Sequence, residues 1–367
     1  MGIELILAEI FILYAFAVIF IGARIFARYM LVGLKGFQPD DFLVLLLLAV
    51  WTGSAVIGYT FTIVAQGKHT SLLTPEQRED IPVADREGWS YGSKIFLAGL
   101  TGYILIVWIV KLNQLFFYRR VVRGLWVQKT IFPAMGFLAA AFVAIILTIT
   151  LNCLPFEKVW QVYPDPGANC VPQSHAVFTV ILSLNLATDF CILLIPLPAL
   201  RSLQLPLTKK LGLWLLFSLG ALCMVFAILR YVYVFQLGDS QGISASWSTR
   251  EAFVATFVGQ APMIYPLCTP RFWARRRNKT VSSSSHGLSG NSGNRHKPLS
   301  GEEHEMGGSF AVSSGGGRKE DGAFAGVNWL GVVVHGMGLL TSDGPTLGIL
   351  GVNIRAPIGY FVILQAT

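Results

Sequence analysis

The sequence predicts an all-α polytopic membrane protein, a bundle of seven transmembrane helices with its N-terminus outside and its C-terminus in the cytosol. Of the 367 residues, 53% are apolar or aromatic and only 13% are charged. Soluble domains carry roughly 25% charged residues, so we expect lipid around most of the surface. These figures exclude a soluble enzyme, a secreted disulfide scaffold and a disordered chain.

Seven apolar segments have the length that a membrane-spanning helix needs. A hydrocarbon core of about 30 Å takes roughly 20 helical residues, and a helix satisfies its own backbone hydrogen bonds in lipid. The predicted spans are residues 3–23, 42–65, 95–117, 131–151, 175–197, 211–235 and 250–268.

These spans differ in how many interruptions they contain. The second and fourth have no charged residue, and the sixth has none before Arg230. The third holds Lys111, the fifth holds Asp189 and ends near Pro196, and the seventh contains Pro262. Together they predict a membrane domain over residues 1–275, followed by a flexible, Ser/Gly-rich cytosolic tail over 276–367.

The basic residues of the short loops predict the orientation, because lysine and arginine collect on the cytosolic side of a membrane. The loops on one side hold fifteen of them and those on the other side hold five. The larger set is Arg24, Arg28, Lys35, Arg119, Arg120, Arg123, Lys129, Arg201, Lys209, Lys210, Arg271, Arg275, Arg276, Arg277 and Lys279. This collar accounts for most of the net charge of +8, so we expect no nucleic-acid partner.

Two of the five cysteines lie in one predicted outer loop. Cys153 and Cys170 would therefore meet an oxidising compartment, whereas the remaining cysteines lie in spans or at a cytosolic end. We predict a Cys153–Cys170 disulfide. The other outer loop, residues 66–93, either covers the helix ends or is simply solvated.

Ionisable residues inside spans are costly and face the bundle interior, where they pair or line a path. At 1.5 Å per residue, Lys111 lies about 24 Å and Asp189 about 21 Å below the outer ends of their helices. The matching depths predict a Lys111–Asp189 pair. By the same rise, Arg230 and Glu9 share a depth close to the outer surface, which predicts a second pair.

Asn185 lies one turn before Asp189 and projects from the same helix face. With Lys111 it forms a predicted polar cluster at membrane depth. Its role is either a structural clamp between the third and fifth spans or a site for a ligand or ion.

Several kinds of chemistry lack the residues that they require. Only His69 and His175 precede the tail, so we expect no metal site. The seventh predicted span contains no lysine, so a retinal Schiff base is not expected. No phosphate-binding loop or nucleophile elbow is present, and we expect neither an enzyme nor a cofactor.

Charged residues also mark the predicted cytosolic face. Asp40 and Asp41 stand where the second helix begins, so they complement its dipole and can cap free backbone donors. Arg24 or Arg28 is the expected partner. Arg119 and Arg120, at the end of the third helix, serve either as topology signals or as contacts for anionic lipid or a cytosolic signalling partner.

Taken in order, these motifs resemble the fungal rhodopsin-domain integral membrane proteins over about residues 5–275. The residues that carry the resemblance are Arg24-Ile25-Phe26-Ala27-Arg28, Asp40-Asp41, Lys111, Tyr118-Arg119-Arg120-Val121, Cys153-Leu154-Pro155-Phe156, Trp160, Gly167, Cys170, Asn185, Asp189, Pro196-Leu197-Pro198, Leu203, Lys210, Arg230, Trp247, Glu251, Pro262 and Pro266. The resemblance implies a seven-helix fold and a plasma-membrane or secretory-pathway location.

The same resemblance implies a receptor-like function, with an extracellular or intramembrane ligand that the sequence does not identify. A transporter that uses the Lys111 and Asp189 cluster is the alternative, and a membrane scaffold is the third candidate. In each case the lipid bilayer is the expected environment.

Overall fold

The computed structural model describes residues 3–33, 38–121, 127–167, 169–195, 207–235 and 243–264. Within these ranges the regular structure is helical, with no strand. The long helices are α1 (Ile3–Val32), α2 (Pro39–Ile63), α4 (Val83–Val121), α5 (Gln128–Leu151), α6 (His175–Leu194), α8 (Leu207–Phe235) and α9 (Ile243–Ile264). The predicted tail, residues 276–367, lies outside the described residues, as do the last residues of the fifth and seventh predicted spans.

Local sequence signals explain several helix ends. Gly33 follows α1 with a φ of +70°, a conformation that costs glycine little, and its N–H donates to Tyr29 O at 3.0 Å. Pro39 opens α2, where its missing N–H leaves no helical hydrogen bond unmade. The Asp41 carboxylate, one turn in, accepts a hydrogen bond from the Gln38 N–H at 2.9 Å. The predicted capping role therefore belongs to Asp41.

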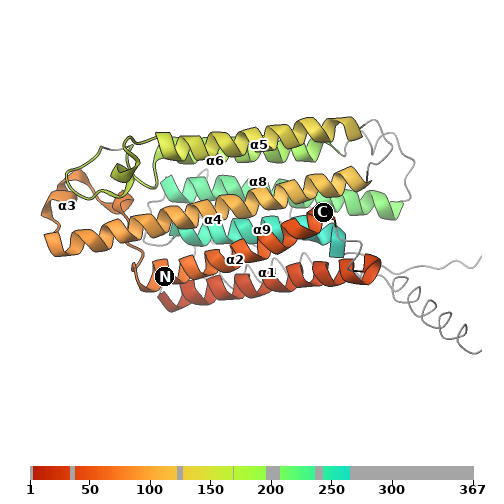
Figure 1. The fold of residues 1–367 in the computed structure, drawn as a ribbon, viewed down its shortest axis with the longest axis horizontal. Helices are drawn as coiled ribbons and strands as arrows, with labels where there is room; N and C mark the ends of the chain where they lie inside the picture. The colour runs from red at the N-terminus through yellow and green to blue at the C-terminus, as the bar shows by residue number, and fades with distance from the viewer. Residues whose placement is uncertain are drawn as a thin grey trace, which may run out of the picture. The chain divides into compact units, whose positions relative to one another are not determined.

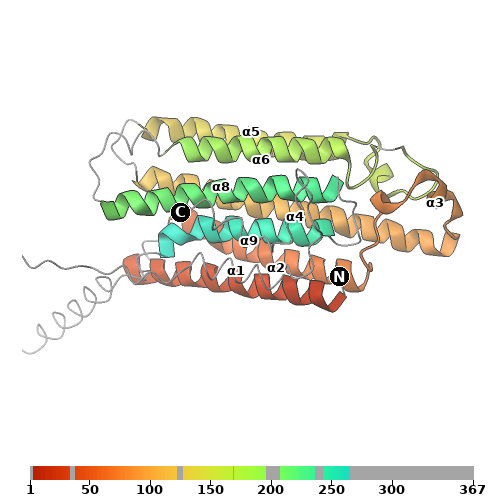
Figure 2. The same ribbon diagram turned by 180° about the vertical axis from the view of Figure 1, so that it is seen from behind.

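The seven long helices of the described chain pack as a closed ring. Helix α4 is a member of this ring and also contacts helices on the other side of its interior. Neighbouring contacts run from α1 to α2, α2 to α4, α4 to α5, α5 to α6, α6 to α8, α8 to α9 and α9 back to α1. In addition, α4 contacts α6 and α9, and Figures 1 and 2 show it passing between the other helices. The chemistry at the centre of this ring therefore depends mainly on α4.

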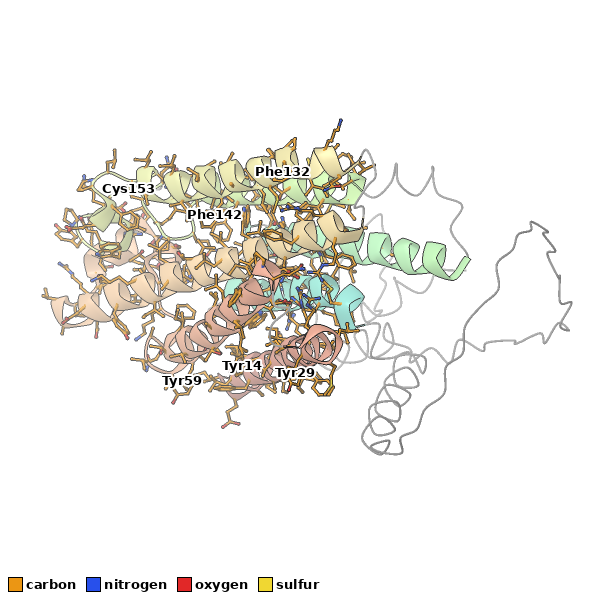
Figure 3. The ribbon with its side chains drawn as sticks, turned by 45° about the vertical axis from the view of Figure 1, so that its right-hand side comes forward. Tyr14, Tyr29, Tyr59, Phe132, Phe142 and Cys153 are labelled. Carbon is orange, nitrogen blue, oxygen red and sulfur yellow. A yellow bond between two sulfur atoms is a disulfide. The ribbon has the colours of Figure 1, made fainter. Side chains whose placement is uncertain are left out.

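The outward faces of the ring are apolar, as a lipid environment requires. Five helices of the described chain, α1, α2, α4, α5 and α6, are long and apolar enough to cross a membrane. Exposed aromatic residues such as Tyr29, Tyr59 and Phe132 lie on α1, α2 and α5, respectively (Figure 3). By contrast, most of the apolar part of α4 is buried against other helices. The multi-pass membrane location expected from the sequence is confirmed.

Helix α4 extends well beyond its predicted start at residue 95. It begins at Val83 and runs for 39 residues, which corresponds to about 58 Å at 1.5 Å per residue. Asp85, Arg86 and Glu87 lie in its first turns. A membrane span predicted from hydropathy stops at such charged residues, although the helix continues through them. Part of the predicted outer loop 66–93 is therefore helix, and α3 (Pro75–Asp80) and the short 3₁₀ helix η2 (Thr70–Leu72) occupy much of the rest.

The end of the bundle at which α4 begins is here called the disulfide end. It is covered by two loops that contact each other: residues 66–82 and the loop between Cys153 and Cys170, here called the disulfide loop. Cys153 and Cys170 form the predicted disulfide, which is confirmed, and η3 (Phe156–Trp160) lies between them and contacts α4. Arg78 of α3 donates to Thr70 O at 2.8 Å and to Gln161 O at 3.1 Å. The loop 66–82 therefore covers helix ends together with the disulfide loop.

Candidate functional site

Lys111 is the centre of a polar cluster inside the ring. Its ammonium lies 2.6 Å from Asn185 Oδ1, 2.9 Å from Asn185 O, 2.8 Å from Thr188 Oγ1 and 3.1 Å from Asp189 Oδ1. The structure thus brings together Lys111, Asn185 and Asp189, which the sequence grouped in one polar cluster, and it adds Thr188. Because an ammonium has three N–H groups, the two Asn185 oxygens and Thr188 already use its donors, and Asp189 is its longest contact.

Glu251 of α9 continues this cluster towards the disulfide end. Its Oε1 accepts from Tyr103 OH at 2.7 Å and from Asn185 Nδ2 at 3.1 Å, and its Oε2 accepts from Arg230 Nε at 2.7 Å. The Arg230 guanidinium also lies over the Tyr103 ring, 4.6 Å from its centroid. A continuous set of contacts therefore joins Arg230 to Lys111 through α9 and α6.

The predicted Arg230–Glu9 pair is wrong. Arg230 pairs with Glu251, whereas Glu9 accepts hydrogen bonds from Arg250 Nε and, at 2.9 Å, from Arg250 Nη2. The predicted seventh span started at residue 250, which placed Arg250 and Glu251 at the membrane edge. In fact α9 starts at Ile243, about two turns earlier, so both side chains are buried in the bundle.

A small cavity lies against the Lys111 cluster. Side chains of α4, α6, α8 and α9 line it, including Lys111, Gln114, Asp189, Cys223 and Glu251. The space that the centre of a water molecule can occupy is about 40 Å³, and one water takes roughly 10–15 Å³ of such space. The cavity thus has room for a few water molecules or a small chemical group.

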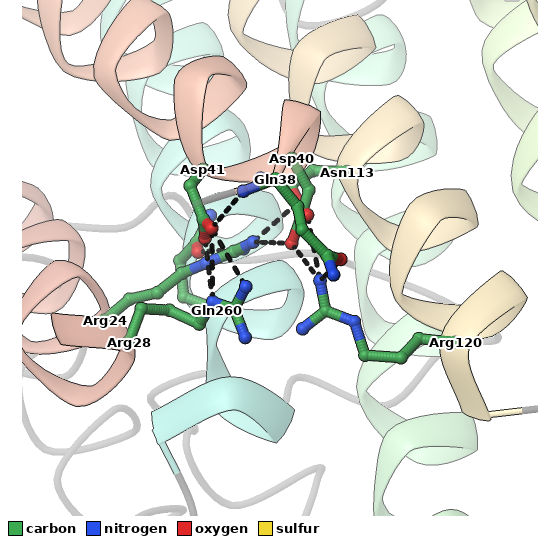
Figure 4. A network of polar contacts seen from close by, with 8 residues as sticks. All are labelled: Arg24, Arg28, Gln38, Asp40, Asp41, Asn113, Arg120 and Gln260. Carbon is green, nitrogen blue, oxygen red and sulfur yellow. Dashed lines mark hydrogen bonds and ion pairs between the residues drawn. The ribbon is translucent and has the colours of Figure 1, made fainter. Parts of the chain in front are cut away.

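A second polar cluster lies at the opposite end of the bundle, here called the Asp40 end (Figure 4). Arg120 Nη2 lies 2.8 Å from both carboxylate oxygens of Asp40, and Arg24 Nη2 lies 3.4 Å from Asp40 Oδ2. Arg28 holds Asp41 through two hydrogen bonds of 2.9 Å. Both arginines of α1 therefore find the acids that the sequence offered as partners.

The Asp40 cluster also contains two amide side chains that the sequence did not single out. Arg24 donates to Gln260 Oε1 at 2.6 Å and to Asn113 Oδ1 at 2.8 Å, so this one buried guanidinium contacts α2, α4 and α9. The available signal was an uncharged amide within an apolar helix at the depth of a buried arginine. Arg24 Nε, Asn113 Nδ2 and Gln260 Nε2 are buried and have no hydrogen-bond partner among the described residues.

Arg119 lies apart from both clusters. Its guanidinium packs over the ring of Phe132, 5.1 Å from the centroid, on an exposed part of the Asp40 end. Across the described chain, no group of three or more His, Cys, Asp or Glu side chains converges as a metal site.

Both polar clusters lie in a part of the chain that matches a known protein family. The model of the fungal rhodopsin domain matches residues 23–274. The chain belongs to the fungal rhodopsin domain family. The match covers both polar clusters and the disulfide loop, with Glu9 outside it, and confirms the resemblance inferred from the motifs.

Three relatives of this fungal rhodopsin domain protein come from fungi. Fugralins biosynthesis cluster protein 2 of Gibberella zeae is 26% identical over 137 residues, 35% of this chain and 34% of the relative. Satratoxin biosynthesis SC1 cluster protein 4 of Stachybotrys chartarum is 26% identical over 208 residues, 51% of this chain and 74% of the relative. Receptor GIN3 of Arthrobotrys oligospora is 24% identical over 256 residues, 67% of this chain and 58% of the relative. No solved structure matches the chain.

Proposed function

We propose that this fungal rhodopsin domain protein is a seven-helix receptor that senses an extracellular or intramembrane ligand and signals to a cytosolic partner. In this proposal the disulfide end faces outside and the Asp40 end faces the cytosol. The distribution of lysine and arginine supports that orientation. The similarity to a relative named as a receptor supports the function.

The observation that carries the proposal is the way in which Asp40 ties helix ends together. Through Arg24 and Arg120 it links the start of α2 to α1 and to the end of α4. Arg24 extends the link to α9 through Gln260. One acid and two arginines thus join the ends of four helices, and an exchange of partners among them could report a movement of these helices, which supports reception.

The same cluster offers a way to signal. Asp40 is shared: Arg120 contacts both of its oxygens at 2.8 Å, while Arg24 contacts one oxygen at 3.4 Å, and no described residue accepts a hydrogen bond from Arg24 Nε. If Asp40 turned towards Arg24, Nε and Nη2 would together form the two-pronged contact that arginine prefers with carboxylate. Arg120 would then be free to bind a cytosolic partner.

Transport is the second candidate, because the contacts from Arg230 through Glu251, Asn185 and Lys111 to Asp189 are continuous. Buried ionisable chains of this kind occur along proton and ion pathways. We propose no catalytic role.

Two assays on the full chain separate these functions. Reception predicts that purified protein in nanodiscs recruits a fungal G-protein α subunit, and that changing Arg119 and Arg120 to glutamine abolishes the recruitment. Proton or sodium flux into proteoliposomes that disappears in Asp189→Asn, without any recruitment, would instead establish the transporter and overturn the receptor.

A further inference from the structure

Asp189 differs from the other buried carboxylates of the described helices in how few hydrogen-bond donors reach it. Glu9, Asp40, Asp41 and Glu251 each accept two or more hydrogen bonds. Among the described residues, Asp189 makes its one ion pair with Lys111, whose Nζ lies 3.1 Å from Oδ1. Since Lys111 spends its N–H groups on nearer acceptors, the Asp189 carboxylate lacks the donors that a buried carboxylate normally has.

Asp189 belongs to the wall of the cavity. Its side chain is 16% exposed, whereas the side chains of Lys111 and Glu251 are 4% and 3% exposed. The amide of Gln114 lines the same cavity, and no described residue hydrogen-bonds to it. The cavity therefore presents one strong acceptor together with an amide that can donate and accept.

Charge and surface decide what kind of group fits. Lys111 and Arg230 balance Asp189 and Glu251, so an added cation would leave a net charge in a low-dielectric site. The remaining walls are mostly apolar: Val107, Val110, Ile192, Leu193, Ala255 and Val258. A hydroxyl group is uncharged, donates one hydrogen bond and accepts others, so it matches these walls better than an ammonium.

We propose that this cavity binds the hydroxyl end of a small, otherwise apolar molecule, whose O–H donates to Asp189 Oδ2 and whose oxygen accepts from Gln114. The space of about 40 Å³ limits the buried part to a hydroxyl and a few carbons. The inference rests on the proposed receptor function, because it names the chemical class of ligand that such a receptor would recognise within the membrane.

Photolabelling tests the site directly. The probe is a butanol carrying a diazirine, applied to the full chain in nanodiscs, and adducts are mapped by mass spectrometry. We expect adducts on lining residues such as Val107, Ile192 and Val258. Excess 1-butanol should lower them at least tenfold, whereas n-pentane, which replaces the hydroxyl by a methyl group, should not.

Two pairs of variants complete the test. Ala255→Leu fills the cavity and should abolish these adducts, whereas Ala139→Leu, the same change on an exposed face of α5, should leave them unchanged. Asp189→Asn should weaken binding on the order of tenfold, because the hydrogen bond to a charged carboxylate is replaced by a weaker one to a neutral amide; Asp165→Asn, in an exposed loop, is its control.

The overturning results are distinct. Adducts only on lipid-facing residues, adducts insensitive to Ala255→Leu, or equal competition by pentane would each overturn the hydroxyl site. An empty or water-filled cavity that takes no label would do the same. None of these results bears on G-protein recruitment, so failure of the site and failure of the receptor proposal are separable.

Discussion

Arg120, at the end of α4, places one guanidinium nitrogen 2.8 Å from both carboxylate oxygens of Asp40, at the start of α2. Arg24 approaches the same carboxylate only to 3.4 Å. One acid therefore serves two arginines unequally, and the weaker partner, Arg24, is the more deeply buried of the two. This asymmetry is the structural basis for proposing that Asp40 exchanges partners when the protein signals.

The Lys111–Asp189 pair should show energetic coupling. Removing the charge in Lys111→Met leaves Asp189 without its ion partner, which should cost about 3 kcal/mol of unfolding free energy. Adding Asp189→Leu should recover part of that cost. A double-mutant cycle in detergent, read by thermal or denaturant unfolding, would contradict the pairing if the two single effects simply added.

The corrected arginine partners give a second cycle with an internal control. Arg230→Met and Glu251→Gln should couple by about 1–3 kcal/mol, since their side chains share a hydrogen bond of 2.7 Å. Arg230→Met and Glu9→Gln should be additive within about 0.5 kcal/mol. Coupling of Arg230 to Glu9 but not to Glu251 would restore the pairing that the sequence suggested.

Gly92 should not tolerate a side chain. A Cβ there would overlap with the carbonyl oxygen of Lys68, in the loop that covers this part of α4. Gly92→Ala should therefore destabilise the disulfide end by about 1–3 kcal/mol. Gly88→Ala, one turn earlier with open space around it, is the matched control and should be neutral or stabilising by up to about 1 kcal/mol. Equal unfolding free energies for the two variants would contradict the packing of this loop.

His69 should make the disulfide end sensitive to acid. Burial against Phe96, with ring centroids 4.5 Å apart, lowers the pKa of His69 from 6.5 to about 4 because the charged form is desolvated. The unfolded chain then binds the proton first. Stability is retained above about pH 6.5 and lost as the pH falls towards 4, by about 3 kcal/mol in all.

The measurement is unfolding free energy against pH for the wild type and His69→Gln. The variant lacks the titrating group, so its curve should be flatter between about pH 6.5 and 4. Parallel curves for the two proteins would show that His69 does not contribute.

Much of the fold could be predicted because lipid imposes a simple rule on helix length. The predicted start of the fifth span coincides with the start of α6 at His175, and the predicted end of the fourth coincides with the end of α5 at Leu151. The start of α4 could not be predicted, because beyond the membrane a helix continues through charged residues such as Asp85 and Glu87. Hydropathy carries no information about that part.

The charged residues of the candidate site could be predicted where a single one lies within an apolar span. Lys111 and Asp189 were found because each interrupts an apolar run. Glu251 was missed as a buried acid because it follows Arg250 at a boundary that hydropathy placed too late. The amides Asn113 and Gln260 carry no charge, so depth alone does not single them out, and only the packing around Arg24 reveals their role.

The measurement closest to the central claim compares two neighbouring acids. Asp40→Asn should release Arg120 and raise the affinity of the nanodisc-embedded protein for a G-protein α subunit on the order of tenfold, about 1.4 kcal/mol. Asp41→Asn weakens the contact with Arg28 and the cap on the Gln38 N–H at the same helix end; it touches no contact of Arg120 and should leave the affinity unchanged. Equal binding by the wild type and both variants, or no binding by any of them, would contradict the claim that Asp40 restrains Arg120 until the receptor signals.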